Sequence, residues 1–311
     1  MSATKSDVPD VPDVQDASGV PDTSPQALVD RLCALMRLAP AGEDRFIGES
    51  EDLGWPAVFG GQLLGQSLMA ASHTVDADRA AHSMHAYFLL GVRPAPIEYA
   101  VERVRDGRSF SGRRVVARQD GRVVFEMSAS FQTAAEGVEH QVAKPPQSPG
   151  PEGLQSEREQ RLALGARLPA YWRAESMQPQ AIDYRPVSPV DLLDPLPCPA
   201  DSAIWVRAVA RLPDDPALHR ALLAYVSDNG LLPAAFRPHG LGLMQPGMRA
   251  ASLDHAMWFH RDGRLDDWLL HVVDSPVGGN ARVLCRGSLF DRGGRLLAST
   301  MQEGMLRLQR G

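Results

Sequence analysis

The alternation of hydrophobic and polar positions predicts helices and strands in a regular order along the first half of the chain. An amphipathic pattern over residues 25–38 predicts a helix that begins after a Ser24 cap and Pro25. A glycine-led stretch at residues 58–75, with leucines at helical spacing, predicts a second helix. Strand-like runs then follow at residues 82–90, 97–105, 109–118 and 122–132.

The same order of elements restarts after residue 200. It predicts a strand at 203–210, a helix over 216–228, and strands near 249–260, 266–273, 281–290 and 295–307. The halves also match directly, because "DGRVVFEMSASF" (120–131) aligns without gaps with "GGRLLASTMQEG" (293–304). A helix followed by an antiparallel sheet, present twice, predicts an α+β fold built by duplication. A repeat of about 110 residues suits two fused hotdog units, in each of which a sheet wraps around one central helix.

Composition divides the chain into four segments. Residues 1–24 are acidic and proline-rich and repeat the tripeptide VPD, which predicts a disordered tail rather than a signal peptide. Residues 25–135 and 201–311 are the two predicted hotdog units. Residues 136–200 contain "KPPQSPGPEG" and "SPVDLLDPLPCP", and this proline content predicts a connector with room for one short helix.

Charge and cysteine content exclude several classes of protein. A formal net charge of −6 and a pI near 5.8 argue against a nucleic-acid-binding protein. The three cysteines are scattered, with no CxxC or Cys/His cluster, which indicates a reducing compartment and no zinc site. His82 and His85 would point to opposite faces of a strand, so a metal site is not expected there either. No apolar run approaches the roughly 18–20 residues that span a membrane, so we expect a cytoplasmic protein.

The segment "LLAYVSDNGLLP" (222–233) places a carboxylate along the apolar stripe of a predicted helix. Asp228 follows Tyr225 and Ala221 at intervals of three and seven residues, and Asn229-Gly230 then ends the helix. A carboxylate on a buried face costs free energy unless something pairs with it or uses it. The negative end of the helix dipole would also raise its pKa. Asp228 is therefore either a helix terminator or a base.

A glutamine lies on the otherwise small and apolar face of the last predicted strand. In the aligned first half, the position of Gln302 is held by Ala129, so the polar group exists in one copy only. This asymmetry predicts one working site per chain, built by the second half. The structural alternative is a glutamine that binds a neighbouring backbone group.

The tetrapeptide "SLDH" suggests a serine-hydrolase triad but has the wrong geometry for one. In a single strand, Ser252 and Asp254 share one face while His255 points to the other. A triad needs the histidine between the nucleophile and the acid. No G-x-S-x-G elbow occurs in the chain, which further weakens this interpretation.

A second pair, Asp214 and His219, has the D-x4-H spacing that resembles the dyad of hotdog enoyl-CoA hydratases. Asp215 and Pro216 instead fit the cap and first turn of the following helix. The hydratase pattern also has Asn-Pro where this chain has Pro216-Ala217. We favour the helix-capping interpretation.

Arginines crowd one predicted hairpin region. They are Arg103, Arg105, Arg108, Arg113, Arg114, Arg118 and Arg122. Such runs are usually solvated faces, although phosphate groups are the natural ligand for any that bind. Arg108 and Arg113 are our candidates for contacts with a phosphorylated substrate.

Long blocks of the sequence resemble the acyl-CoA thioesterase II family, the double-hotdog thioesterases. In the first half they are "SEDLGWPAVFGGQLLGQSLMAA" (50–71), "HSMHAYFL" (82–89) and "VERVRDGRSFSGRRVVARQDGRVVFEMSASFQ" (101–132). In the second half they are "YVSDNGLLP", "RPHGLGLMQPG", "ASLDHAMWFHR", "DDWLL" and "ASTMQEGMLR". The order of the blocks agrees with the family across residues 27–310.

The resemblance implies hydrolysis of acyl-CoA to free acid and coenzyme A, without a metal, a cofactor or an acyl-enzyme. The family's catalytic aspartate falls on Asp228, its hydroxyl residue on Ser252 and its glutamine on Gln302. These side chains would hold one water, whose proton Asp228 accepts as the water attacks the thioester carbon. The candidate oxyanion donors are backbone N–H groups near Gly60, Gly61 and Gln62.

Two departures from the family concern the pocket more than the reaction. This chain reads "FLLGVRPAP" (88–96) where members commonly have "FLRPGD", and Ser252 replaces a threonine whose methyl group fixes its rotamer. The family also implies a homodimer or homotetramer. Two rival functions stay open: a hotdog enoyl-CoA hydratase that uses Asp214 and His219, and a non-catalytic acyl-CoA-binding protein.

Overall fold

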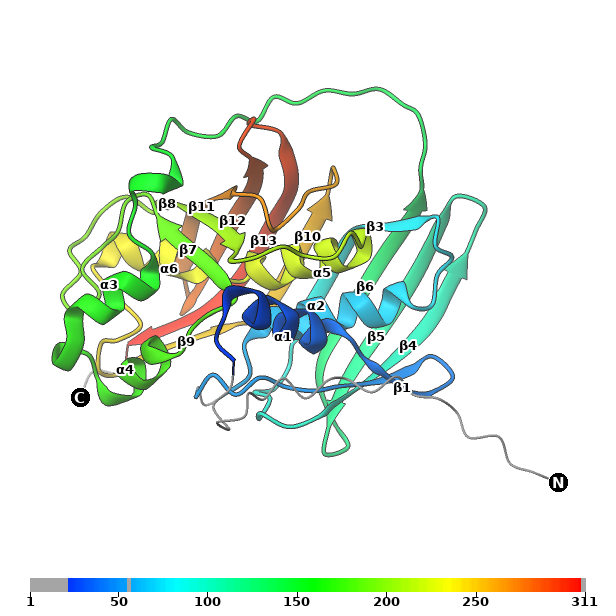
Figure 1. The fold of residues 1–311 in the computed structure, drawn as a ribbon, viewed down its shortest axis with the longest axis horizontal. Coiled ribbons are helices and arrows are strands. Elements are labelled where there is room, and N and C mark those ends of the chain that lie inside the picture. The colour runs from blue at the N-terminus through cyan, green and yellow to red at the C-terminus, as the bar shows by residue number, and fades with distance from the viewer. Residues whose placement is uncertain (1–21, 55–56, 309–311) are drawn as a thin grey trace.

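One antiparallel sheet runs through the molecule, and helices cover one of its faces (Figure 1). This computed structural model describes residues 22–54 and 57–308. The first-half strands are β1 (Ala39–Gly42), β2 (Arg45–Gly48), β3 (Arg79–Phe88), β4 (Ile97–Asp106), β5 (Phe110–Gln119) and β6 (Arg122–Thr133). The second-half strands are β7 (Ile182–Pro186), β8 (Asp201–Ala208), β9 (Met248–Ser252), β10 (Asp254–Phe259), β11 (Leu269–Gly279), β12 (Arg282–Asp291) and β13 (Leu296–Leu308).

The two halves share this sheet. The strand order is β1-β2-β4-β5-β6-β3-β10-β13-β12-β11-β8-β7, with β9 paired to β13 outside that path. The seam is the antiparallel pair β3–β10, in which Ala86 lies opposite His255 and Met84 lies opposite Met257. The predicted α+β fold of two fused hotdog units is confirmed.

The helices are α1 (Pro25–Met36), α2 (Gly60–Ser72), α3 (Glu157–Leu164), α4 (Ala170–Met177), α5 (Pro216–Ser227) and α6 (Leu231–Phe236). Short 3-10 helices occupy Pro151–Gly153, Gly165–Arg167 and Arg237–His239. As predicted, Ser24 caps α1 by accepting a hydrogen bond from the Ala27 N–H, and Asp215 caps α5 by accepting from Ala217 and Leu218. No helix in the described ranges is long and apolar enough to cross a membrane.

Several elements differ from the predictions. The single strand predicted at 249–260 is two strands, because Leu253 interrupts it and its N–H bonds the Glu303 carbonyl at 2.9 Å. The proline-rich connector contains α3, α4 and the edge strand β7, which is more structure than the one short helix expected. Most of the tail predicted to be disordered, residues 1–21, lies outside the described part of the chain.

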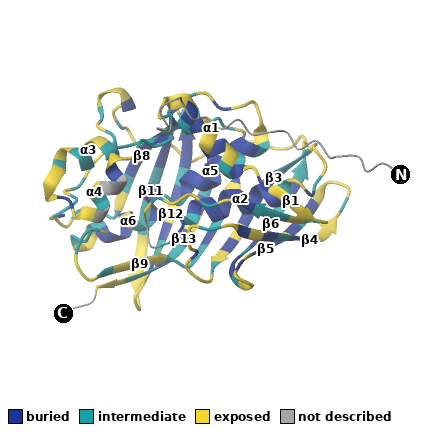
Figure 2. Cartoon of the chain, turned by 60° about the horizontal axis from the view of Figure 1, so that its bottom comes forward, coloured by how far each residue is buried: buried dark blue, intermediate teal, exposed yellow. Residues whose placement is uncertain are grey.

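The central helices are buried on almost every side, as Figure 2 shows for α2 and α5. Every residue of α2 from Gly61 to Ala71 is buried, so its apolar surface extends beyond the single face that the leucine spacing predicts. The sheet covers one side of α2, while α1 and α5 pack on the other. This arrangement leaves room at the helix contacts only for very small side chains.

Glycine makes the contact between α2 and α5 possible. A Cβ at Gly61 would lie 2.1 Å from the Tyr225 carbonyl oxygen, and one at Gly65 would lie 3.0 Å from the Ala221 carbonyl oxygen. The beginning of α2 therefore meets the end of α5, so the helices run antiparallel with their backbones almost touching. This contact brings the first turn of α2 to the last residues of α5.

We expect Gly61→Ala to lower the free energy of unfolding by about 1–3 kcal/mol, because the added methyl group meets immovable backbone. Urea denaturation midpoints would measure the loss. Gly137→Ala is the matched control, because a Cβ there has nothing within 4 Å. If the two variants are equally stable, the close helix contact does not limit the fold.

Candidate active site

Asp228 ends α5 and faces the beginning of α2. It is the C-cap residue of α5, and its carboxylate accepts a hydrogen bond from the backbone N–H of Gly61. A Cβ built on Gly60 would lie 2.6 Å from its Oδ2 atom, so the helix backbone is as close as side-chain packing allows. The carboxylate is thus set against the positive end of the α2 dipole.

The structure brings Ser252 and Gln302 to this carboxylate. β9 pairs with β13 so that Ser252 lies opposite Gly304, two residues from Gln302. The Gln302 Nε2 group donates to Ser252 Oγ at 2.7 Å, and Ser252 Oγ lies 3.4 Å from Asp228 Oδ1, to which it donates. The three residues named from the sequence therefore form one hydrogen-bonded group. Their catalytic role stays a prediction.

His255 belongs to the same group, although the strand alternation of the sequence placed it on the opposite face from Ser252. Its Nδ1 atom lies 2.6 Å from Gln302 Oε1, and its Nε2 atom lies 3.0 Å from Ser227 Oγ. The expectation that Ser252 and His255 point to opposite faces is wrong, because Leu253 breaks the strand between them and resets the alternation. The conclusion that no Ser-His-Asp triad forms still stands: the ring contacts Gln302 and Ser227 rather than Ser252.

Burial dominates the electrostatics of the site. It raises the pKa of Asp228, while His255, Gln302, Ser252 and the Gly61 N–H act in the opposite direction. Burial likewise lowers the pKa of His255, which has no exposed surface. Ionisable groups whose pKa values are strongly shifted by burial cluster at functional sites, so Asp228 and His255 mark this end of α5 as a candidate site.

Two of the three residues named as oxyanion donors, Gly61 and Gln62, have other partners for their N–H groups. The Gly61 N–H binds Asp228, and the Gln62 N–H donates to the Phe59 carbonyl at 3.0 Å. The Gln62 side chain is buried, donates to the Glu49 carbonyl at 3.1 Å and accepts from the Glu51 N–H at 3.1 Å. It therefore holds the preceding loop, and an oxyanion role for this turn stays a prediction.

The two candidate phosphate ligands lie away from the carboxylate. Arg113 is 2% exposed, and its guanidinium donates to Thr74, Asp106 and backbone carbonyl groups. Thr74 follows the end of α2, so Arg113 lies about 20 Å along the helix from Gly61. These contacts give Arg113 a structural role and weigh against the predicted contact with substrate. Arg108 is exposed and leaves that prediction untested.

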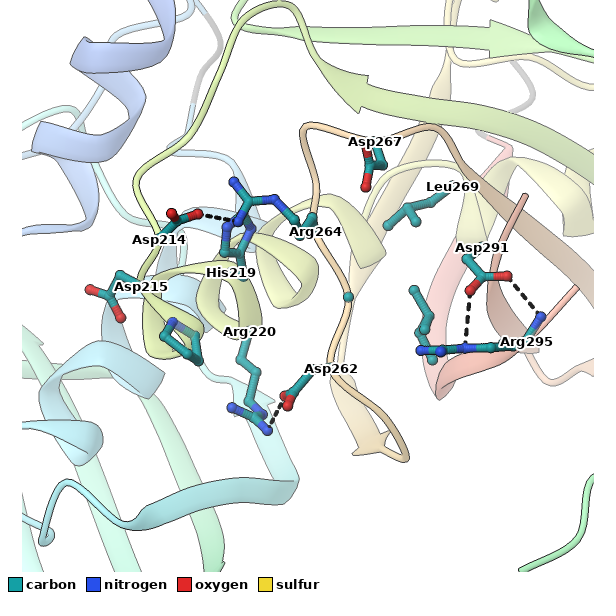
Figure 3. A pocket seen from close by; sticks show the side chains of 13 residues that line it. Asp214, Asp215, His219, Arg220, Asp262, Arg264, Asp267, Leu269, Asp291 and Arg295 are labelled. Carbon is teal, nitrogen blue, oxygen red and sulfur yellow. Dashed lines mark hydrogen bonds and ion pairs between the residues drawn. The ribbon is translucent and has the colours of Figure 1, made fainter. Parts of the chain in front are cut away.

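The alternative pair lies at the other end of α5, beside a cavity of about 440 Å³ (Figure 3). Asp214 pairs with Arg264 there, while His219 Nδ1 accepts from the Leu265 N–H at 3.3 Å. Further arginine–aspartate pairs, Arg220–Asp262 and Arg295–Asp291, line the cavity. Asp214 is thus engaged with a cation rather than with His219. In the described ranges, no cluster of His, Cys, Asp or Glu has the arrangement of a metal site.

Known proteins of the same architecture place the chain in a family. The family model described as acyl-CoA thioesterase matches residues 179–305, and the one described as acyl-CoA thioesterase N-terminal domain matches residues 51–132. The chain is 35% identical to acyl-CoA thioesterase 2 of Haemophilus influenzae, over 90% of this chain and 98% of that protein. It is 36% identical to human acyl-coenzyme A thioesterase 8, over 89% of each.

A solved structure agrees with this assignment. Acyl-CoA thioesterase II TesB2 from Mycobacterium marinum shares 40% identity and a TM-score of 0.73, covering 89% of this chain and 98% of that one. A hot dog fold protein from Alicyclobacillus acidocaldarius, 21% identical with a TM-score of 0.72, supports the fold alone. The chain belongs to the acyl-CoA thioesterase family, which confirms the resemblance found in the sequence.

The raised pKa of Asp228 predicts a stability effect. The folded state holds this proton more tightly than the unfolded chain does, so ionised Asp228 destabilises the fold at neutral pH. We expect Asp228→Asn to raise the thermal midpoint at pH 7. The gain should shrink as the pH falls through the raised pKa of Asp228, where the wild-type carboxyl becomes neutral.

The matched control for this experiment is Asp262→Asn, which removes an exposed partner of Arg220 and should give no gain. Calorimetry at several pH values would measure both variants. A lower midpoint for Asp228→Asn at pH 7 would contradict the assignment of burial as the dominant effect.

Proposed function

We propose that this protein hydrolyses fatty acyl-CoA thioesters to free fatty acid and coenzyme A. The observation that carries the proposal is the hydrogen-bonded group of Asp228, Ser252 and Gln302 at the first turn of α2. The thioesterase names of the relatives support the substrate class. The group offers a carboxylate base beside two side chains that can orient a water molecule.

In the proposed reaction, the three side chains hold one water against the thioester. Asp228 accepts a proton as the water oxygen bonds to the carbonyl carbon, and the carbon–sulfur bond then breaks. The thiolate is a good leaving group and takes up the proton, so no separate strong acid is required. Holding the water in place removes the entropy cost of finding it. Burial assists because a carboxylate with a raised pKa is a stronger base near neutral pH.

Ser252 acts in this proposal through its hydroxyl hydrogen bonds and not as a nucleophile. Its Oγ atom accepts from Gln302 and donates to Asp228. A serine nucleophile of the triad type would need an imidazole beside its hydroxyl to take the proton. His255 binds Gln302 instead, which favours direct attack by water over an acyl-enzyme.

Association into oligomers is proposed from exposed side chains on the sheet. Tyr87, Trp258 and Met301 are exposed on the adjacent strands β3, β10 and β13, and exposed aromatic side chains favour a homodimer or homotetramer. Sedimentation velocity would measure the oligomeric state.

The cysteines Cys33, Cys198 and Cys285 are free thiols in the structure, which supports the proposal of a cytoplasmic protein.

The two rival functions have less support. A hydratase would use Asp214 and His219, but Asp214 is paired with Arg264. A non-catalytic binder would have no use for a buried carboxylate that weakens the fold. A panel of acyl-CoA substrates from short to long, including an enoyl-CoA, separates these functions because it reports thiol release, hydration or binding alone.

Replacing the base should nearly abolish turnover. We expect Asp228→Asn to lower kcat by about 100-fold or more, the usual range for loss of a general base, with a smaller change in KM. Thiol release from acyl-CoA, followed with a thiol-reactive dye, measures this. Asp214→Asn is the matched control and should keep wild-type kcat. Turnover of Asp228→Asn near that of the wild type would remove this carboxylate from the mechanism.

The pH dependence of the reaction should follow the same carboxylate. Because the pKa of Asp228 is raised, kcat/KM should fall on the acidic side at a pH above the usual range of an aspartate. The fall reflects protonation of the base, so activity returns as the pH rises. An acidic limb at the ordinary aspartate pKa would show that burial does not tune this group.

A further inference from the structure

Hydrogen bonds continue behind Gln302 into the core. The His255 ring lies between Gln302 Oε1, at 2.6 Å from Nδ1, and Ser227 Oγ, at 3.0 Å from Nε2. Ser227, His255 and Gln302 have no exposed surface. Bulk water therefore cannot replace a lost partner in this part of the network, and each polar atom depends on its neighbour.

The number of hydrogens that each side chain carries determines which group donates to which. Gln302 Oε1 can only accept, so the Nδ1 atom of His255 must carry a hydrogen. The other ring nitrogen, Nε2, lies 3.0 Å from Ser227 Oγ, whose single hydroxyl proton also lies within reach of the Ala224 carbonyl at 2.9 Å. Donation then runs from His255 to Gln302 and Ser252, and ends on the Asp228 carboxylate.

The opposite orientation of the Gln302 amide would remove the side-chain hydrogen bonds that Asp228 accepts. If the amide turned over, its N–H would face His255 and its oxygen would take the Ser252 hydroxyl proton. Ser252 would then have no proton to donate to Asp228, and the amide N–H would no longer face the carboxylate. Glutamine alone has no preference between these orientations, so the groups on its two sides decide: the Asp228 carboxylate accepts from one side, and the Nδ1–H of His255 donates from the other.

We propose that His255 is a positioning residue, which fixes the orientation of the Gln302 amide through its Nδ1–H and thereby aims the Gln302 and Ser252 donors at the water-activating carboxylate. This inference rests on the proposed function of Asp228, Ser252 and Gln302. His255 itself contacts neither the carboxylate nor the proposed water. It acts through Gln302, so its effect should depend on Gln302 being present.

Three substitutions of His255 separate hydrogen bonding from packing. His255→Asn keeps an N–H near the Nδ1 position, His255→Gln reaches the Nε2 position and faces Ser227, and His255→Leu keeps bulk without a donor. We expect His255→Asn to retain kcat within about threefold of wild type, while the other two lose about tenfold or more, the effect of one well-aligned hydrogen bond. KM should change less than kcat, because binding of the acyl-CoA does not use the amide orientation.

If His255→Leu fails to fold, the comparison of His255→Asn with His255→Gln decides alone, since both are polar. Equal loss of kcat in the Asn and Gln variants would overturn the proposal, and so would full activity of the Leu variant. His260→Asn is the control, because His260 follows on the same chain segment and its ring binds Ser299 away from the group. It should leave kcat unchanged.

A double-mutant cycle separates this inference from the proposed function. With Gln302→Ala in place, His255→Leu should cost nothing further in kcat, because the residue it positions is gone. A second tenfold loss in that background would show that His255 acts through packing, and would overturn the inference while leaving the proposed function intact. If Gln302→Ala alone keeps wild-type kcat, the proposed function of Gln302 fails first.

Discussion

The close contact between the α2 and α5 backbones fixes the geometry on which the candidate site depends. Gly61 and Gly65 allow α2 to approach the Tyr225 and Ala221 carbonyl groups. With larger side chains the helices would stand further apart, and the first N–H groups of α2 would not reach Asp228. The close packing of the two helices therefore places the beginning of α2, which carries partial positive charge, next to the Asp228 carboxylate.

Burying a carboxylate at this contact balances two opposing effects. Loss of water destabilises the charged form, while donors from the Gly61 backbone, Ser252 and Gln302 stabilise it. The balance leaves the pKa of Asp228 raised. Full compensation would give a weak base, and no compensation would give a carboxyl that never loses its proton near neutral pH. A partly compensated carboxylate suits a role in which a proton is taken and then returned.

Much of the fold and the carboxylate could be predicted from the sequence because their signals are local. Helical and alternating patterns located the long elements, and the stripe of α5 singled out Asp228. The burial of Arg113 had a local signal, because Arg113, Val115 and Ala117 occupy every second position of β5 and therefore share one buried face. The break at Leu253 had no such signal, because "ASLDHAMWF" reads as one strand. The break depends on where β9 and β10 pair with distant strands, so the facing of His255 relative to Ser252 could not be predicted either.

The pairing of Ala86 with His255 links correct assembly of the two halves to the state of the site. Successive residues of a strand face opposite sides, so a shift of β10 by one position against β3 would turn the imidazole out to solvent. The hydrophobic side chains of Met257 and Phe259 would be expelled with it. A molecule whose halves join in the wrong register therefore loses its core and its hydrogen-bonded network together. Correct register at the seam between the two halves is therefore a condition for the hydrogen-bonded group on the β10 side to form.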